Sequence, residues 1–225
     1  MKMQQAHAKS FLIFGGNSRL AKIFFSQFPN DTILIPKSVC DIRKKESIER
    51  VLIKNKSQYI INCAAITDIE LCEQKPRLCF ETNIIGLHNL QEICNKYNRK
   101  LIHISSNYAL NPKNNYGLSK YIGEKIIDQN NLIIRTSFYD KDTYIIKNLL
   151  TNKPVNAYSN MYINPVSIYN LIQEIYRSKD KTGVQNIFSD KKISWYQFAC
   201  CFCEVFNMNK NLIKKTLFKK QAYKA

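Results

Sequence analysis

The sequence predicts a protein of the α/β class, in which a doubly wound parallel sheet is followed by a small C-terminal lobe of mixed structure. Short apolar runs alternate along the first 135 residues with segments whose apolar residues recur at helical spacing. These runs are apolar on both faces, which is typical of parallel strands that are covered on two sides. The helical segments between them are long enough to be crossover connections.

Five strands are expected where the apolar runs lie. The first of them ends in a glycine turn, which favours the end of a strand. The runs are SFLIFGG (10–16), TILIP (32–36), YIINCAA (59–65), LIHISS (101–106) and NLIIRTS (131–137).

Four helices are expected to alternate with these strands. Pro76 fits the first turn of the third helix, where the N–H that proline lacks has no partner in the helix. The helical segments are SRLAKIFFSQF (18–28), KKESIERVLIKN (44–55), PRLCFETNIIGLHNLQEICNKY (76–97) and the stretch from about 116 to 128.

The charge of the chain is high but spread out. The sequence has a net charge of +17, with lysines throughout. We therefore favour a compositional bias over binding of an anionic small ligand or of nucleic acid. The longest apolar run, 198–203, is too short to span a bilayer, and no apolar stretch precedes Phe11. We expect no membrane segment and no secretory signal.

The eight cysteines are scattered along the chain. Only Cys200 and Cys203 have Cys-x-x-Cys spacing, and no second pair completes a zinc site. We expect reduced thiols in the core, no metal, and a cytoplasmic protein.

A candidate phosphate-binding turn follows the first strand, in FGGNSRLA. The backbone N–H groups of such a turn and of the following helix N-terminus can bind a pyrophosphate. Gly15 occupies the first glycine position of the usual fingerprint, but Ser18 and Ala21 occupy the other two. A plain strand–turn–helix junction is the alternative interpretation.

Small and hydroxyl-bearing residues end two further strands. Ala64 and Ala65 leave room for an adenosine or ribose, although simple small-residue packing explains them equally well. Ser105 and Ser106 end the fourth strand, where serine is more often a turn former. Ligands of doubly wound sheets bind at the carboxyl ends of the strands. Several such residues at these ends therefore indicate a binding site more strongly than any one of them alone.

A Tyr-x-x-x-Lys spacing occurs twice, as Tyr116/Lys120 and Tyr121/Lys125, and composition alone accounts for about as many matches. Residues i and i+4 share one face of a helix, whereas Tyr121 lies about 140° away from Tyr116. Only the first pair can share a face while following directly from the loop after Ser106.

Several ordered motifs resemble the extended short-chain dehydrogenase/reductase superfamily, specifically its dTDP-4-dehydrorhamnose reductase-like (sugar-nucleotide-binding) family. The resemblance runs from about residue 10 to 206. It is carried by NCAAITDIELCE, ETNIIG, HISSNY, YGLSKYIGE, LIIRTSFY and ISWYQFA.

The resemblance implies a proton-transfer site of Ser106, Tyr116 and Lys120. Tyr116 would protonate a substrate carbonyl as the nicotinamide delivers hydride, Lys120 would lower the pKa of Tyr116 and hold the ribose, and Ser106 would bind the developing oxyanion.

The resemblance also implies a set of cofactor-binding residues around the sheet edge. Tyr116 and Lys120 belong to this set as well. The other members are Gly15, Asn17, Ser18, Arg19 and Leu20 at the pyrophosphate, Asp41 and Ile42 near adenine, and Ala64, Ala65 and Thr67 beside adenosine and ribose. Lys37 is added to the set on its charge alone.

Cofactor choice follows from the residues after the second strand. Lys37 and Ser38 stand where an NAD-selective site usually has an acidic residue, and a cation there favours a 2′-phosphate. We expect NADP(H) to be favoured, with NAD(H) possible.

The expected domains are a dinucleotide-binding Rossmann domain over 10–150, a substrate-side lobe over 151–208 and a basic C-terminal tail over 209–225. The tail has six lysines and no acid, and we expect truncation after Met208 to leave cofactor binding unchanged.

The chain departs from the family pattern in three places. Two glycines of the phosphate turn are replaced, Asn107 stands where the family has Asp, and the link from Ser106 to Tyr116 is short. Substrate contacts are therefore expected to be reduced or altered.

The leading hypothesis is NAD(P)H-dependent reduction of a keto group on a nucleotide-linked deoxysugar, in nucleotide-sugar and surface-polysaccharide biosynthesis. The alternatives are a non-catalytic cofactor-binding regulator or scaffold, and a same-fold epimerase or dehydratase. The expected partners are a sugar nucleotide and a second copy of the chain, as a homodimer.

Overall fold

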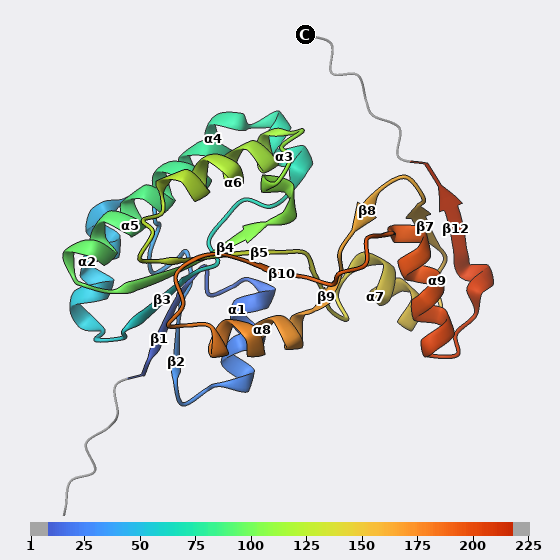
Figure 1. The fold of residues 1–225 in the computed structure, drawn as a ribbon, viewed down its shortest axis with the longest axis horizontal. Helices are drawn as coiled ribbons and strands as arrows, with labels where there is room; N and C mark the ends of the chain where they lie inside the picture. Colours follow the sequence, from blue (N-terminus) through green and yellow to red (C-terminus); the bar gives the residue numbers. More distant parts are fainter. Residues whose placement is uncertain (1–8, 218–225) are drawn as a thin grey trace, which may run out of the picture. The chain divides into compact units, whose positions relative to one another are not determined.

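The computed structural model describes residues 9–217, and the chain divides into two compact units. The first unit consists of the chain up to Thr136 together with Ile172–Ile187. The second unit consists of Ser137–Leu171 and the chain from Phe188 onward. The boundary expected near residue 150 therefore lies at 136/137, because the chain leaves the first unit at the end of its fifth strand and later returns to it (Figure 1).

A six-stranded parallel sheet forms the centre of the first unit, in the order β10-β5-β4-β3-β1-β2. The five expected strands are confirmed, and a sixth one follows much later in the chain. The strands are β1 (Phe11–Phe14), β2 (Thr32–Ile35), β3 (Tyr59–Asn62), β4 (Lys100–Ser106), β5 (Leu132–Thr136) and β10 (Gly183–Ile187). The strand order reverses between β1 and β3, which is where ligands of such sheets bind.

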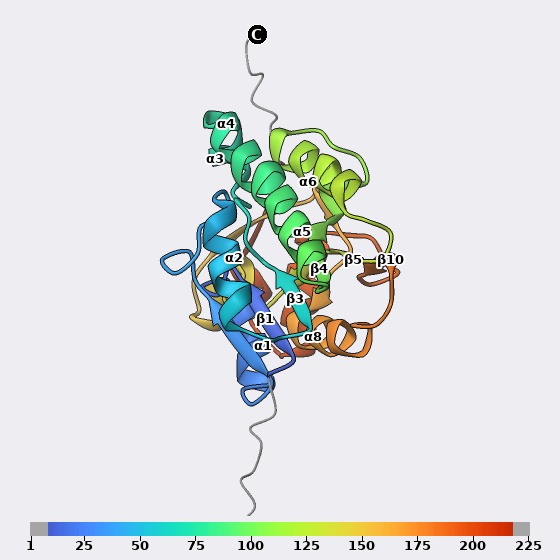
Figure 2. The same ribbon diagram turned by 90° about the vertical axis from the view of Figure 1, so that its left-hand side faces the viewer.

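Helices cover both faces of this sheet. Figures 1 and 2 show α2 (Lys45–Lys54), α5 (Gly86–Lys96) and α6 (Asn115–Ile126) on one face, with α1 (Arg19–Gln27) and α8 (Ile168–Arg177) on the other. The doubly wound class predicted from the sequence is therefore confirmed.

The long helix expected over residues 76–97 begins at Pro76, as predicted. It is interrupted by one feature that the sequence did not indicate. Between α4 (Pro76–Phe80) and α5 lies a π-helical turn, Glu81–Ile85, and the short helix α3 (Ile69–Gln74) precedes α4. π-Turns of this kind are frequent at functional sites.

The core of the first unit is built from apolar residues on both faces of the sheet. All four residues of β1 are fully buried, and apolar residues of β1 and β3 pack against α2 and α5 in one cluster. Burial on both faces explains why these strands read as continuous apolar runs.

The second unit is built around a parallel strand pair. β7 (Val155–Tyr158) pairs with β12 (Ile213–Thr216), and α7 (Tyr144–Leu150) and α9 (Trp195–Val205) supply residues to the same apolar cluster. Two short strand pairings and a 3-10 turn complete the set of elements. They involve β6 (Phe138–Tyr139) with β9 (Val166–Ser167), and β8 (Tyr162–Ile163) with β11 (Ile193–Ser194), together with the 3-10 turn Lys210–Leu212 that leads into β12.

The tail expected at 209–225 is, in its described part, a structural element. β12 forms a full ladder with β7, and Leu212 and Ile213 pack on the apolar cluster of the second unit. Lys214 and Lys215 of this strand are exposed, but a segment whose apolar residues pack on the second unit is not a solvated tail. Truncation after Met208 would remove this strand, and residues 218–225 lie outside the described part.

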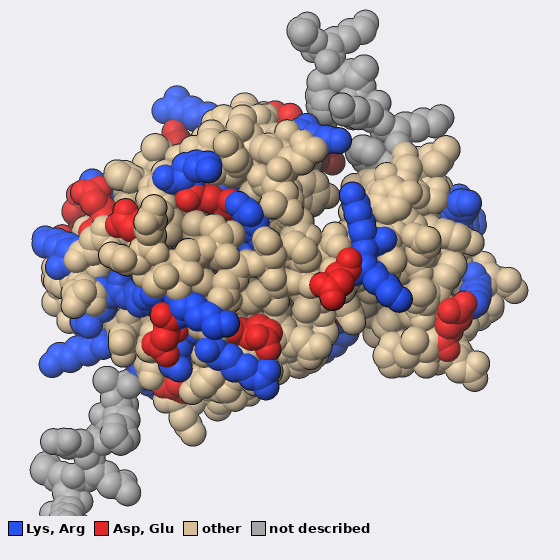
Figure 3. All heavy atoms as spheres, in the orientation of Figure 1, with Lys and Arg blue, Asp and Glu red and all other residues tan. Residues whose placement is uncertain are grey.

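The charges and thiols follow the sequence expectations. Figure 3 shows Lys and Arg scattered over the drawn face and interleaved with Asp and Glu. All eight cysteines are free, and five of them are buried: Cys40, Cys72, Cys79, Cys94 and Cys203. Over residues 9–217 no group of three potential metal ligands comes together, and no helix has both the length and the apolar content needed to cross a membrane.

Candidate active site

Two serines end β4, and the structure gives them different surroundings. The Ser105 hydroxyl donates to Glu124 at 2.5 Å, and Glu124 in turn forms a buried salt bridge with Arg135 at 2.6 Å. The Ser106 hydroxyl oxygen instead accepts a hydrogen bond from the backbone N–H of Tyr108 at 3.3 Å. Ser105 is therefore fixed within the helix–sheet packing, and only Ser106 is directed to the start of α6.

The N-terminus of α6 is held by its own capping residue. The Asn114 side chain accepts from the N–H of Gly117 at 2.7 Å, and the N–H of Asn115 donates to Glu73 at 2.6 Å. A Cβ at Gly117 would lie 2.9 Å from the carbonyl oxygen of Tyr108. This close approach brings the first turn of α6, and with it Tyr116, against the loop that follows Ser106.

The Tyr116 hydroxyl lies near Ser106, whose side chain acts on the pKa of the phenol. The ring is 9% exposed and meets the Tyr108 ring edge-on, with a centroid distance of 5.7 Å. Burial raises the pKa of Tyr116 to about 12, and Ser106 opposes this rise. Tyr116 thus keeps its proton at neutral pH, as a proton donor must.

Lys120 lies one helical turn further along α6 and is 2% exposed. Its Nζ donates to the carbonyl oxygen of Ile104 at 2.7 Å and lies 3.1 Å from Nε2 of His103. Burial lowers the pKa of Lys120 to about 8.

The expected effect of Lys120 on Tyr116 is not seen in this structure. The main influences on the pKa of Tyr116 are burial, Ser106, Tyr108 and two thiols, and they do not include Lys120. The physical reason is that the lysine nitrogen is bound to β4 through Ile104 and His103, while the phenol lies near Ser106.

The second Tyr-x-x-x-Lys pair lies on the surface, as the helical geometry predicted. Tyr121 is 40% exposed, and Lys125 stacks over its ring at 5.2 Å from the centroid. This pair is a solvent-facing cation–π contact.

The turn after β1 comes very close to the end of β3. Gly15 has a φ of +76°, and a Cβ there would lie 2.5 Å from the backbone nitrogen of Ala64. Any side chain at this position would therefore collide with the backbone, which explains the glycine. Ser18 caps α1 by accepting from the N–H of Ala21 at 3.2 Å. The serine that replaces the second glycine is thus committed to the helix cap through its oxygen.

Cys63 connects this turn with the lysine. Its thiol hydrogen-bonds Ser18, and the charge of Lys120 lies near enough to oppose the rise in its pKa that burial causes. The structure therefore brings Ser18, at the N-terminus of α1, and Lys120 to the same end of the sheet.

The other expected cofactor residues have mixed positions. Asn17, Arg19, Lys37 and Thr67 are exposed, and Ala64 and Ala65 are half-buried. Leu20 and Ile42, in contrast, are buried in the core, so that only the backbone of Leu20 is available to a ligand. Ile42 packs where a Cβ at Gly86 would fall, at 2.7 Å.

Asp41 is paired with a residue that the sequence analysis did not select. The Nε of Arg43 donates to its carboxylate at 3.0 Å, and this hydrogen bond lowers the pKa of Asp41 to about 2. Arg43 also lies 3.9 Å from Glu81. Lys37 and Arg43 therefore place two cations near Asp41.

Three buried polar residues were also missed, namely Asn62, Asn83 and His103. Asn83, from the π-helical turn, exchanges hydrogen bonds with the backbone of Ile66 at 2.8 and 2.9 Å and donates to Ser119 at 2.9 Å. It thereby ties the loop after β3 to α6. The sequence did contain a sign of these three residues, because each is a polar residue within an otherwise apolar strand or helix face.

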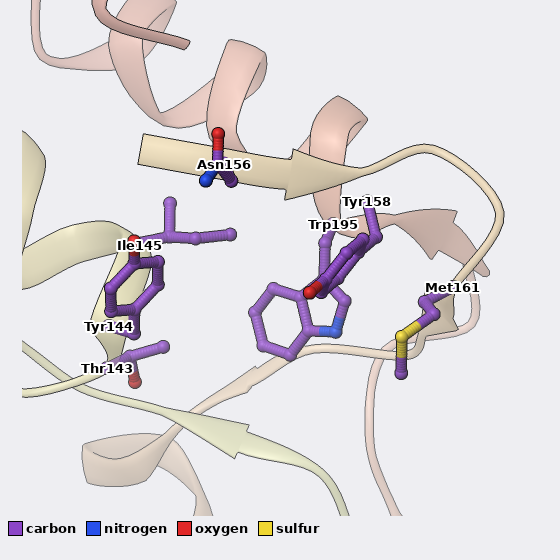
Figure 4. A pocket seen from close by; sticks show the side chains of 7 residues that line it. All are labelled: Thr143, Tyr144, Ile145, Asn156, Tyr158, Met161 and Trp195. Atoms are coloured by element: carbon purple, nitrogen blue, oxygen red, sulfur yellow. The ribbon is translucent and has the colours of Figure 1, made fainter. Parts of the chain in front are cut away.

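The second unit contains a cavity of about 320 Å³ whose lining includes three aromatic residues. Figure 4 shows Trp195 and Tyr158 near one another, with Tyr144 across from Trp195 and the side chain of Asn156 projecting from β7. Thr143, Ile145 and Met161 complete the lining. Lys214 is the ladder partner of Asn156, so the two side chains project from the same face of the strand pair.

The chain belongs to the family described as the RmlD substrate binding domain, whose model matches residues 9–225. This confirms the family expected from the motifs. Among relatives, a dTDP-4-dehydrorhamnose reductase of Aggregatibacter actinomycetemcomitans is 22% identical over 80% of this chain and 72% of that protein. The spore coat polysaccharide biosynthesis protein SpsK of Bacillus subtilis is 21% identical over 83% of this chain and 74% of its own length.

Coverage of the relatives is uneven. A dTDP-4-dehydrorhamnose reductase of Mycolicibacterium smegmatis is 25% identical, but the match spans 53% of this chain and only 42% of that protein.

Solved structures share the fold. A dTDP-4-dehydrorhamnose reductase from Bacillus anthracis, in complex with NADP, superimposes with a TM-score of 0.84 at 22% identity over 94% of this chain and 85% of that one. A UDP-glucose 4-epimerase from Thermus thermophilus, in complex with NAD, gives a TM-score of 0.77 at 16% identity over 93% and 90% of the two chains. The Rossmann-type fold is thereby confirmed.

Proposed function

We propose that this protein is an NAD(P)H-dependent reductase that converts a keto group of a nucleotide-linked deoxysugar into a hydroxyl group. The observation that carries the proposal is the buried Tyr116, which lies near Ser106 at the carboxyl end of β4, with Lys120 on the same face of α6. A buried tyrosine and lysine in this relation have no evident structural purpose that Phe and Leu would not serve better.

The turn after β1 fits a dinucleotide. Gly15 lets the turn pack directly on the backbone at Ala64, and the N-terminus of the nine-residue helix α1 that follows offers N–H groups to phosphate. When bound, the cofactor supplies hydride to the substrate carbon. Tyr116 then donates its proton to the carbonyl oxygen, and Ser106 stabilises the negative charge that develops there.

We infer a preference for NADPH over NADH from the charges after β2. Lys37 and Arg43 are cations that can bind a 2′-phosphate, and Asp41, the nearby acid, is already paired with Arg43. The neighbour from Bacillus anthracis with bound NADP supports this choice. Calorimetric titration with the two cofactors tests it, and tighter binding of NADH would contradict it.

The aromatic cavity of the second unit, taken by itself, suits a nucleotide. Rings such as those of Tyr144 and Trp195 stack on a planar base, Asn156 can both donate to and accept from its edge, and Lys214 can approach a phosphate. Trp195 is the single tryptophan of the chain, so its fluorescence reports on this cavity directly.

Fluorescence titration with uridine and thymidine diphosphates is expected to be saturable, whereas free glucose should have no effect. Tyr144→Ala should weaken nucleotide binding, and Tyr169→Ala, which changes an exposed tyrosine outside the cavity, should not. Equal effects of the two variants would remove the cavity from the proposal.

The activity itself is tested by mixing the protein and NADPH with keto-sugar nucleotides and following the loss of nicotinamide absorbance. Turnover that disappears in Tyr116→Phe supports the proposal. Tight NADPH binding without turnover on any keto-sugar would instead favour the non-catalytic cofactor-binding role, for which the replaced glycines at Ser18 and Ala21 are the supporting observation.

A further inference from the structure

A chain of buried polar groups leads from Lys120 to the end of β3. Lys120 Nζ lies 3.1 Å from Nε2 of His103, and Nδ1 of His103 lies 3.3 Å from Nδ2 of Asn62. The side-chain oxygen of Asn62 accepts from the N–H of Ala64 at 3.0 Å. Lys120, His103 and Asn62 are each 2% exposed, so water does not satisfy these groups.

The backbone fixes the orientation of the Asn62 amide. The N–H of Ala64 can only donate, so the Asn62 oxygen must face it, and the NH₂ group must then face His103. Nδ1 of His103 is therefore an acceptor. A neutral imidazole with an unprotonated Nδ1 carries its single proton on Nε2, which is the atom beside Lys120.

This arrangement is compatible with only one charge state of the lysine. An ammonium group has no lone pair and cannot accept the Nε2 proton, whereas a neutral amine can. His103 itself stays neutral in both charge states of Lys120, because burial alone holds its pKa well below the usual value and a charged Lys120 lowers it further. Because burial lowers the pKa of Lys120 to about 8, a fraction of the lysine is neutral near physiological pH.

We propose that His103 and Asn62 are positioning residues for Lys120, and that proton uptake by Lys120 moves the ring proton of His103 from Nε2 to Nδ1 and turns the Asn62 amide. One proton is taken up in total, and it comes from solvent and ends on Lys120. The His103 ring loses its proton at Nε2 and gains one at Nδ1, so the charge of the ring does not change. With the amide turned, the Asn62 oxygen accepts from Nδ1 and releases the N–H of Ala64.

The consequence reaches the cofactor side of the sheet. Ala64 is the residue against which the Gly15 turn packs, so the charge of Lys120 is linked to the backbone at the proposed pyrophosphate and ribose site. The other titratable groups that face Lys120 are Glu124 on α6, Cys63 after β3 and Cys79 on α4. Glu124 is held in a salt bridge with Arg135. Burial raises the pKa of Cys63, so this thiol does not change charge near neutral pH.

The test reads the ring directly and needs no substrate. The protein is labelled with ¹⁵N at histidine, and the ring nitrogens are followed by NMR from about pH 6 to about pH 10. His88→Gln removes the signal of a half-exposed surface histidine and serves for assignment. We expect the Nε2–H tautomer of His103 at high pH and the Nδ1–H tautomer at low pH, with a midpoint near the pKa of Lys120, about 8.

Two variants sharpen the test. Lys120→Met should keep His103 in the Nε2–H tautomer over the whole range. Asn62→Asp places a carboxylate, which only accepts, beside both Nδ1 and Ala64, and should hold the ring in the Nδ1–H tautomer throughout. In a fully folded parent, a tautomer that never changes, or a change that survives in Lys120→Met, would overturn the proposal.

The proposal gives a role to the Lys120 of the proposed function, but its readout is independent of turnover. If the tautomer change is seen but no keto-sugar is reduced, the proposed link between the charge of Lys120 and the tautomer of His103 stands. Only the proposed reductase function is then contradicted. Should turnover be found, Asn62→Asp is expected to shift its lower pH limit, while Tyr116 and Ser106 are unchanged.

Discussion

Helix α6 contains the same Tyr-x-x-x-Lys spacing twice, and the two pairs have opposite environments. Tyr116 and Lys120 are 9% and 2% exposed, and both lie near residues of β4 or its end. Tyr121 and Lys125 form a cation–π contact on the surface. Identical spacing on one helix therefore yields a candidate acid–base pair or a surface contact, depending on the face that meets the sheet. Burial changes the pKa values of the inner pair and makes it chemically useful.

The largest expected difference between the two pairs is in turnover. Tyr116→Phe removes the proton donor and keeps the ring, so turnover of a keto-sugar nucleotide should fall by about 10²–10⁴ while folding and cofactor binding persist. Tyr121→Phe is the matched control and should have no effect. Steady-state kinetics of both variants decide the point, and the reverse pattern would mean that the site is on the other face of α6.

The lysines should differ in cofactor binding as well. Lys120→Met removes a buried charge proposed to hold the ribose, and NADPH affinity should fall by about 10–100-fold, as for loss of a charged hydrogen bond. Turnover should fall with it. Lys125→Met should leave both unchanged, as measured by calorimetry and kinetics. Equal losses in the two variants would indicate a general electrostatic effect of this basic chain.

Stability should depend on pH through the inner lysine. The pKa of Lys120 is lowered from 10.5 to about 8 in the folded state, so its burial costs free energy below pH 8, and this cost disappears as the pH rises to 10.5. The free energy of unfolding of the parent, relative to Lys120→Met, should therefore rise on the order of 3 kcal/mol across that window. Urea unfolding at several pH values measures it, and a flat difference would contradict the lowered pKa.

The smallest expected effect belongs to the outer pair. Lys125→Met removes the cation over the Tyr121 ring and should lower the free energy of unfolding by about 0.5 kcal/mol. Urea unfolding near neutral pH is sufficient to detect such a change. A larger loss would show that the surface pair contributes more to α6 than an exposed contact normally does.

The sequence predicted the elements that depend on local pattern. The five buried strands are continuous apolar runs, and Pro76 marks a helix start, so both could be recognised. β12 could not, because its sequence IKKT contains two lysines and the strand forms only through its pairing with β7. The π-helical turn is likewise set by Asn83, whose hydrogen bonds reach residues far away in the chain.

The candidate site shows the same division. Helical spacing selected Tyr116 and Lys120 over the second pair, and the structure places the two pairs on different faces. The attachment of Lys120 to Ile104 and His103 could not be foreseen, because it depends on the register between α6 and β4. For the same reason, the pairing of Asp41 with Arg43 left no sign in the sequence beyond their proximity.

The return of the chain to the central sheet has a consequence for biosynthesis. β10 is the sixth strand, and it pairs with β5 only after residues 137–171 of the second unit have been made. While the ribosome adds those residues, β5 is an open edge of the nascent sheet, and α8 has not yet covered its apolar face. Each unit consists of two segments of the chain, so neither unit can be produced as one continuous fragment. Both units are completed late in translation.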